Sequence, residues 1–341
     1  MTHPYASLPA HAFWRRAVSG DVDPMVSTPF RIGRETPIAT AGSCFAQHIS
    51  RVLTERGYHY LITEPEGEEA GVFPARFGNI YTPRQLLQTF ERAYAVFRPK
   101  DSAWPRADGA FVDPFRPRIR AAGFPTPEAV DADRRGHFAA VRAMFETCDV
   151  LIFTLGLTEG WVSTRDGAAF PLAPGVAGGE PSADYAFHNF SVEELVADLR
   201  AFLAKLRLVN PGVRMILTVS PVPLVATFEP RHVLVSTAYS KAALRVAAEV
   251  IASSEPEVCY FPSYEIITGP QARGRYYAED LRSVTPEGVA RVMEIFSRHF
   301  LGETATPKAA AAAPAGPSAA ETARFQELAA VVCEEEALDV S

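Results

Sequence analysis

The sequence predicts an α/β fold, namely a three-layer α/β/α sandwich with a mainly parallel central sheet of the flavodoxin-like kind. Two observations carry this prediction. A continuous apolar run of strand length occupies 149–155, as is typical of a parallel strand covered on both faces, and 213–219 is the next candidate for a buried strand. Helical patterns separate these runs, and strand and helix alternate at least four times. Right-handed crossovers then give one sheet with helices on both faces, and ligands bind beyond the carboxyl ends of its strands.

Composition narrows the class of protein. The chain has 341 residues, is 48% hydrophobic and carries a net charge of −7, which argues against nucleic acid or an anionic membrane as the main partner. The four cysteines, at 44, 148, 259 and 333, have no CxxC spacing. We therefore expect no disulfide framework, no metal and no cofactor. No apolar run approaches the length of a membrane span, so a cytoplasmic protein is expected.

Shifts in composition predict the organisation of the chain. Residues 1–35 are expected to be an N-terminal leader packed on the body, and residues 36–301 the α/β domain. Within that domain, 97–125 is rich in proline, arginine and glycine and predicts an irregular insertion or lid. Residues 302–320 have the Ala/Pro-rich composition of a linker. The acidic tail, 321–341, contains a short helical pattern and is a candidate for docking a partner protein.

The first strand, turn and helix occupy about 37–56. An apolar run ends at Gly42, Ser43 and Cys44 follow, and the next helical pattern stops at Gly57. Such a turn lifts the hydroxyl and the thiol to the edge of the sheet, and the positive end of the helix favours the thiolate. The alternative is that Ser43 only caps the helix and Cys44 is a small buried hydrophobe.

The remaining elements follow from periodicity and capping residues. A second strand is predicted at 58–62, and Thr82-Pro83 predicts the start of a helix. Another helix is expected at about 127–146, before the strand at 149–155. A capping box at 191–194 opens a helix that ends at Asn210, before the strand at 213–219. A helix at about 237–252, a short strand at 258–261 and a last helix beginning at Thr285 complete the pattern.

Polar residues gather at the predicted strand ends, where this fold places its chemistry. A nucleophile at the first strand end, with a carboxylate before the last helix, suits acyl transfer or ester hydrolysis, and the nucleophile ordinarily needs a histidine base. An amide in a nearby loop suits an oxyanion hole. The candidates are Ser43 and Cys44 after Gly42, Asn79 in the loop, Gly156, Thr158 and Glu159, Ser220, and Asp280 with Arg282.

The stretch Gly42-Ser43-Cys44-Phe45-Ala46 resembles the motif for which the GSCFA family is named. Further segments are similar to that family at 79–83, 155–159, 220–222, 240–241 with Leu244, 261–265 and 277–280, so that the resemblance covers about 35–300. The family is similar to the SGNH hydrolases, a group of esterases, lipases and carbohydrate-deacylating or acyl-transferring enzymes with a three-layer α/β/α fold. The resemblance implies an esterase or acyltransferase acting on an acyl ester of a small molecule or carbohydrate.

The resemblance also implies roles for individual residues. The Gly-Asp-Ser of the wider group falls on Gly42-Ser43-Cys44, which makes Cys44 the nucleophile and Ser43 the alternative. Its Gly-x-Asn-Asp falls on 156–159, where the amide is absent, so Asn79 becomes the expected oxyanion donor. Its closing Asp-x-x-His falls on 280–283, where Asp280 is the orienting carboxylate but Ser283 occupies the position of the base.

Three interpretations of the missing base remain open. Another histidine substitutes, with His188 the first candidate and His48 the second. Alternatively, Cys44 needs little help because a helix N-terminus already favours its thiolate. In the third interpretation the chain is a catalytically degenerate binding or regulatory protein, and Arg282 holds a carboxylate or phosphate in the pocket.

Overall fold

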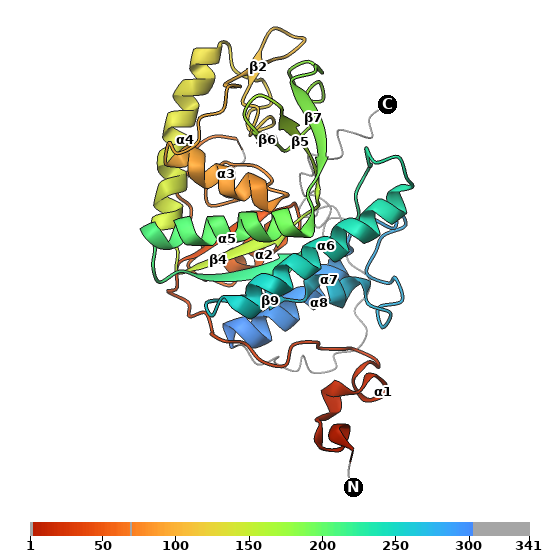
Figure 1. Ribbon diagram of the computed structural model, residues 1–341. Helices are drawn as coiled ribbons and strands as arrows, with labels where there is room; N and C mark the ends of the chain where they lie inside the picture. Colours follow the sequence, from red (N-terminus) through yellow and green to blue (C-terminus); the bar gives the residue numbers. More distant parts are fainter. Residues whose placement is uncertain (1–2, 69, 303–341) are drawn as a thin grey trace, which may run out of the picture.

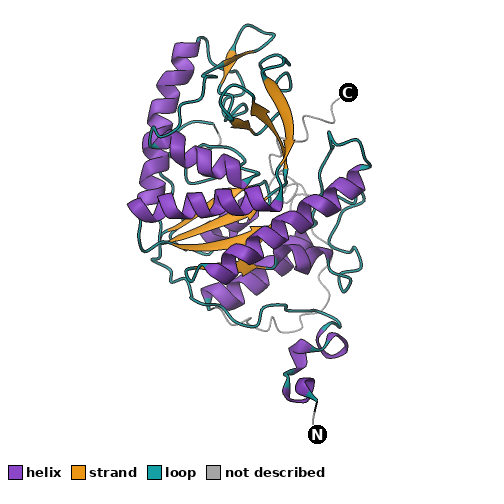
Figure 2. Cartoon of the chain, viewed as in Figure 1, coloured by secondary structure: helices purple, strands orange, loops and turns teal. Residues whose placement is uncertain are grey.

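A four-stranded parallel sheet forms the centre of the protein, as the computed structural model shows for residues 3–68 and 70–302 (Figures 1 and 2). The strand order is β1-β4-β8-β9, and every neighbouring pair is parallel. The predicted fold class, a layered α/β structure with a parallel central sheet, is confirmed. The strands are β1 (Ile38–Gly42), β4 (Val150–Leu155), β8 (Arg214–Val219) and β9 (Val258–Phe261).

The register of the sheet aligns the carboxyl ends of its strands. Gly42 pairs with Thr154, Thr154 with Thr218, and Thr218 with Phe261. The residues that follow these positions therefore leave the sheet side by side, although they are far apart in sequence. This edge is where the fold predicts a binding site.

Helices cover both faces of the sheet, and each face has its own apolar core. Helices α5 and α6 cross in front of the sheet in Figure 1, with α2 and α8 behind it. One layer contains α3 (Pro83–Ala93), α4 (Pro127–Thr147), α5 (Val192–Val209) and α6 (Val233–Ser254); the other contains α2 (Ala46–Glu55), α7 (Ser263–Thr268), α8 (Pro286–Phe296) and the short η3 (Ser297–Leu301).

Three predicted helix starts agree with the structure, whereas one helix start and one predicted strand differ from it. The side chains of Thr82, Ser191 and Thr285 cap their helices as expected. Helix α6 begins at Val233, earlier than predicted, because His232 Nδ1 accepts a hydrogen bond from the first helical turn. The strand predicted at 58–62 is wrong: only Tyr60 bridges to β1, and the chain then turns to bond with Pro74.

A smaller lobe, which periodicity did not predict, stands above the sheet at the top of Figure 1. It consists of short strands packed around Trp104 and Phe170. The irregular segment 97–125 contributes two of these strands and packs against the hairpin strands from 159–189. The strands are β2 (Trp104–Pro105), β3 (Phe111–Val112), β5 (Glu159–Ser163), β6 (Ala169–Phe170) and β7 (Tyr185–Asn189).

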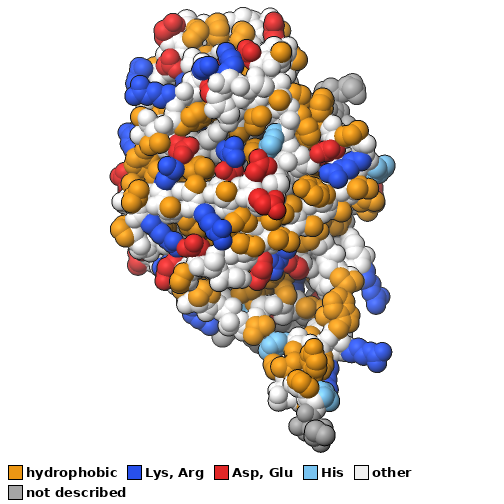
Figure 3. Space-filling model, viewed as in Figure 1, with side chains coloured by type: hydrophobic (Ala, Val, Ile, Leu, Met, Phe, Trp, Pro, Cys, Tyr) orange, Lys and Arg blue, Asp and Glu red, His pale blue; other side chains and the backbone are white. Residues whose placement is uncertain are grey.

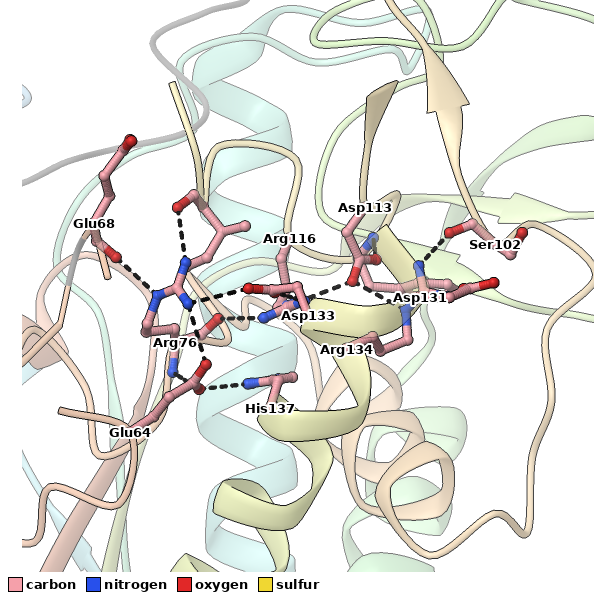
Figure 4. A network of polar contacts seen from close by, with 12 residues as sticks. Glu64, Glu68, Arg76, Ser102, Asp113, Arg116, Asp131, Asp133, Arg134 and His137 are labelled. Carbon is pink, nitrogen blue, oxygen red and sulfur yellow. Dashed lines mark hydrogen bonds and ion pairs between the residues drawn. The ribbon is translucent and has the colours of Figure 1, made fainter. Parts of the chain in front are cut away.

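A buried network of charges holds 97–125 against α3 and α4 (Figure 4). Asp113 is fully buried, and its carboxylate Oδ2 lies 3.0 Å from Arg116 Nε and 3.1 Å from Arg134 Nε. Arg116 also reaches Asp133 at 2.7 Å. Nearby, the Glu64 carboxylate lies 2.7 Å from His137 Nδ1. The apparently unstructured insertion is therefore fixed by ion pairs rather than by long strands.

The predicted leader divides into two parts. Residues 21–35 lie against the body, where the Asp23 carboxylate contacts Arg298 and His299 at 2.7 and 2.9 Å. The short helices before them, η1 (Pro4–Ser7), η2 (Ala10–Ala12) and α1 (Trp14–Ala17), contain no buried residue, and they project from the body in Figure 3. Residues 14 and 18–20, at the end of this first part, share a surface pocket with 270–273 and 275.

The surface and the chain end complete the description. Charged side chains of both signs intermix on the face shown in Figure 3. No helix of the described part of the chain has the length and apolarity needed to cross a membrane. The predicted linker, apart from Gly302, and the predicted acidic tail lie outside the described residues.

Candidate active site

The turn after β1 depends on Gly42. Its φ of 137° lies in a region that other residues rarely adopt, and a Cβ built on it would lie 2.4 Å from the Thr154 carbonyl oxygen. The next backbone N–H, from Ser43, donates to that same oxygen at 3.0 Å. Glycine is therefore required here because β4 approaches too closely for any side chain.

Ser43 and Cys44 line one small pocket at the carboxyl edge of the sheet. The turns after β4 and β8 supply Gly156 and Ser220 to the same pocket, as the alignment of strand ends predicts. Cys44 is 6% exposed and lies two residues before α2, so its thiol sits at the positive end of that helix. Val222, Pro223 and Leu224 supply much of the apolar lining.

The hydroxyl of Ser43 is a buried polar group without a hydrogen-bond partner among the described residues. Gly156 packs tightly against it, since a Cβ at Gly156 would lie 3.1 Å from Ser43 Cβ. A buried hydroxyl without a partner costs free energy, and the Ser43 hydroxyl keeps its capacity to donate a hydrogen bond within the pocket. The capping role considered for Ser43 is not seen: its side chain makes no cap bond to α2.

A buried lysine, which was not among the predicted site residues, also lines the pocket. Lys241 is 2% exposed, and its Nζ donates to the carbonyl of Gly156 at 2.5 Å. Its neighbour Ser240 accepts a hydrogen bond from the Thr158 N–H at 2.9 Å. In the sequence, the only signals were the family-like pair 240–241 and the apolar face of the helix on which Lys241 lies.

Three of the predicted oxyanion and substrate residues, Asn79, Thr158 and Glu159, do not line the pocket. Asn79 is buried next to α2, where its Oδ1 accepts from Gln47 Nε2 at 3.3 Å, and it is not part of the pocket wall. Thr158 bonds Asn189 through its hydroxyl at 2.7 Å. Glu159 accepts from the hydroxyl of Thr227 at 2.7 Å and so anchors the loop after β8.

The predicted carboxylate belongs to an exposed turn before α8. Asp280 accepts hydrogen bonds from the N–H groups of Arg282 and Ser283, both at 2.9 Å, and from the Ser283 hydroxyl. Burial raises the pKa of Asp280, but these bonds outweigh it and lower the pKa overall. Neither Asp280 nor Arg282 lines the pocket. Tyr277, just before the turn, donates its hydroxyl to the carbonyl of Pro221 at 2.7 Å, in the loop after β8.

No histidine of the described chain lines the pocket of Ser43 and Cys44. His188 lies in β7, where its Nε2 contacts Glu194 at 2.8 Å, next to the cap of α5. His48 lies in the first turn of α2 and packs edge-on against Phe45, lining a groove beside α8. Burial and the nearby Arg51 lower the pKa of His48 to about 4. The structure thus brings neither candidate base to the pocket.

A larger groove adjoins the pocket and shares Tyr81, Leu157 and Leu224 with it. Its wall is formed by β5, β7 and the loop after β8. Three aromatic side chains cluster there: the ring of Phe228 lies 5.0 Å from Trp161 and 5.3 Å from Phe187, centre to centre. Phe228 is largely exposed. The smaller lobe and the loop after β8 therefore place an aromatic surface beside the pocket.

Metal ligands and disulfides are not seen in this part of the molecule. Within residues 3–68 and 70–302, no group of three His, Cys, Asp or Glu side chains is arranged to hold a metal ion. Cys44, Cys148 and Cys259 are free thiols.

Comparison with known proteins gives the family. No curated protein sequence matches the chain. Among solved structures, it is similar to a carbohydrate esterase of family 3 from Talaromyces cellulolyticus, with 9% identity, a TM-score of 0.37, and coverage of 77% of this chain and 95% of the other. An acetyl xylan esterase from Butyrivibrio proteoclasticus has 12% identity, a TM-score of 0.26, and coverage of 80% and 66%. The family model of GSCFA matches residues 37–296, so this chain belongs to the GSCFA family.

Proposed function

We propose that this protein is an esterase or acyltransferase that acts on an acyl ester of a small molecule or carbohydrate, with Cys44 as its nucleophile. The supporting observation is the convergence of Ser43, Cys44 and Lys241 in one pocket at the carboxyl edge of the parallel sheet. The resemblance to the SGNH hydrolases, in which this edge carries the nucleophile, supports the same reaction class.

In the proposed reaction, the Cys44 thiolate attacks the ester carbonyl carbon and a tetrahedral oxyanion forms. The C–O bond to the alcohol then breaks, the alcohol leaves with a proton, and the acyl group remains on the sulfur as a thioester. Water or an acceptor hydroxyl attacks this thioester and restores the thiol. The position of Cys44 before α2 favours the thiolate that begins this sequence.

Ser43 is proposed to stabilise the oxyanion. Its buried hydroxyl has no partner among the described residues, so it can donate a hydrogen bond to a negative charge that develops beside Cys44. Loss of one such donor commonly costs about 10²–10³ in turnover. The alternative, in which Ser43 is itself the nucleophile, uses the same pocket and is separated from the first by mutation.

The aromatic groove is proposed to bind the alcohol portion of the ester. Trp161, Phe187 and Phe228 offer flat apolar surfaces beside the pocket, as suits the ring of a sugar or another small alcohol. The pocket itself is small, which favours a short acyl group such as acetyl. We expect Trp161→Ala to raise KM with little change in kcat, because the contact is remote from the reacting bond.

Hydrolysis of p-nitrophenyl acetate and butyrate by the full chain tests the reaction. We expect Cys44→Ala to abolish turnover and Ser43→Ala to reduce it about 10²-fold. Asp280→Ala should have a smaller effect, since that carboxylate is exposed and bonded within its own turn. Turnover that survives Cys44→Ala and is lost in Ser43→Ala would instead make Ser43 the nucleophile.

Alkylation by iodoacetamide tests the nucleophile without a substrate. Cys259 is the matched control, because it is more exposed than Cys44 and burial raises its pKa to about 12. In a Cys333→Ser background, we expect Cys44 to react first, which exposure alone would not produce. A Cys44 that reacts more slowly than Cys259, together with no ester hydrolysis, would reject the enzyme and favour a binding protein.

A further inference from the structure

We propose that Lys241 is the general base of this site, accepting the proton of Cys44 and so doing the work that a histidine at position 283 would do. This assignment rests on the proposed function. It names a catalytic residue that the family motif does not indicate, from a helix in the second half of the chain.

The position of the amine is the first argument. Lys241 Nζ donates to the carbonyl oxygen of Gly156 at 2.5 Å, and Gly156 packs directly against the Cβ of Ser43. Lys241, Ser43 and Cys44 all line the same small pocket. The amine is therefore held in the wall of the pocket that also contains the nucleophile, by a contact to the backbone.

The composition of the pocket is the second argument. Of the ten residues that line it, only Cys44, Tyr81 and Lys241 carry side chains that ionise. Tyrosine accepts a proton only as the phenolate, which is scarce near neutral pH, whereas a neutral lysine amine carries a lone pair that can accept one. Lys241 is thus the residue in this wall that is suited to accept a proton.

The way in which α6 is anchored is the third argument. Thr158 N–H bonds the side chain of Ser240, and Gly156 receives the bond from Lys241, so two successive residues fix the helix to the turn after β4. Burial of a long amine at 2% exposure carries a solvation cost, which a catalytic role explains.

The proton transfer balances without any additional reactant. The Cys44 S–H gives its proton to the neutral Lys241 amine, and the thiolate forms the new bond to the acyl carbon. The Lys241 ammonium then donates that proton to the oxygen of the leaving alcohol as the C–O bond breaks. In the second half of the reaction the amine accepts a proton from water or the acceptor hydroxyl and returns it to the departing Cys44 sulfur.

Three variants test the assignment. Lys241→Met removes the amine and keeps the length of the side chain. Lys241→Arg keeps donors for the Gly156 carbonyl but stays protonated and cannot accept a proton near neutral pH. Lys205→Met is the control, because Lys205 is a surface residue paired with Glu91 at 3.5 Å. We expect both Lys241 variants to lose about 10²–10⁴ in kcat/KM, and the control to stay within twofold.

The rate of Cys44 alkylation as a function of pH provides a second readout that does not need turnover. Without the base, the rate at pH 7 should fall at least tenfold and its midpoint should move to higher pH, while Lys241→Arg remains folded by circular dichroism. A Lys241→Arg variant with wild-type turnover and a wild-type alkylation profile would overturn the assignment. If the wild type hydrolyses no ester but Lys241→Met still slows alkylation, the base stands and the esterase function fails.

Discussion

Two regions of this molecule bury polar groups, and they do so in opposite ways. In the charge network of Figure 4, the Asp113 carboxylate is surrounded by arginines and accepts the backbone N–H of Phe115 at 3.0 Å. At the edge of the sheet, the Ser43 hydroxyl has no partner among the described residues, and Lys241 bonds a neutral carbonyl. Ion pairs around a buried carboxylate hold a segment in place, whereas a buried hydroxyl without a partner can bond to a ligand.

The two regions also depend on different physical features, namely charge in the network and close packing at the sheet edge. In the network, the arginines outweigh burial and hold the pKa of Asp113 far below its usual range, so each charge depends on its neighbours. At the sheet edge, close packing depends on two glycines: Gly42 lies against the backbone of β4, and Gly156 lies against Tyr81 and Ser43. The network should therefore be sensitive to loss of charge, and the edge to added volume.

The largest loss of stability is expected for Asp113→Asn. This change keeps the shape of the side chain but leaves Arg116 and Arg134 buried without their carboxylate, at a cost of about 3–5 kcal/mol in the free energy of unfolding. Urea denaturation measures it. Asp108→Asn is the control, because the half-exposed pair of Asp108 and Arg106 should contribute less than about 1 kcal/mol. Equal effects from both variants would contradict the distinction.

The second-largest loss of stability is expected for Gly42→Ala. The added Cβ would meet the backbone of Thr154 at 2.4 Å, and the φ of 137° is unfavourable for alanine, so we expect a loss of about 3 kcal/mol. Gly109→Ala separates the two causes, because Gly109 also has a positive φ but has nothing within 4 Å of a built Cβ. A Gly42 variant as stable as the Gly109 variant would show that the close approach is unimportant.

A smaller effect is expected from the titration of His137. Burial and Arg116 lower the pKa of this histidine to about 4, below the value of about 6.5 in an unfolded chain. The unfolded state therefore binds more protons between these values, and the protein should lose stability, on the order of 2 kcal/mol, as the pH falls from about 6.5 to 4.

Denaturation at several pH values measures this loss. His137→Gln should flatten the dependence only in part, since the pKa of His48 is lowered in the same direction. The lowered pKa of Glu64, about 2, acts in a more acidic range, because its contribution is lost between about pH 4.5 and 2. Stability that rises on acidification to pH 4.5 would reverse the sign and contradict the burial argument.

The smallest effect is expected for His188→Gln. His188 contacts Glu194, a partly exposed residue of the α5 capping box, and it does not line the pocket. We expect ester hydrolysis to stay within twofold of the wild type and stability to change by less than about 1 kcal/mol. A loss of turnover comparable to that of Cys44→Ala would restore His188 as the substituted base.

Local sequence patterns were sufficient to predict much of the fold and the turn that carries Ser43 and Cys44. Buried parallel strands are continuous apolar runs, and capping residues such as Thr82 and Ser191 mark helix starts, because both signals arise between close neighbours in the chain. The turn of Gly42, Ser43 and Cys44 is local in the same sense. Its position at the sheet edge follows from the strand that precedes it.

Other parts of the fold depend on contacts between distant segments. The strand predicted at 58–62 is reduced to one bridge at Tyr60, because the chain turns toward Pro74. The segment 97–125 has no period to detect, yet Asp113 and Trp104 fix it through partners elsewhere in the sequence. Ion pairs and small aromatic clusters leave no regular spacing, so the sequence alone did not predict this lobe.

For this protein, the sequence by itself determined the layered α/β class, the strands that end at the site and the presence of a hydroxyl and a thiol in the first turn. Only the tertiary structure decided which side chains meet them. It brought Lys241 to the pocket from α6 and left His188 and Asp280 outside it. The physical reason is that helix and strand formation depend on near neighbours and their period, whereas a site depends on which strand ends and helix faces the crossovers bring together.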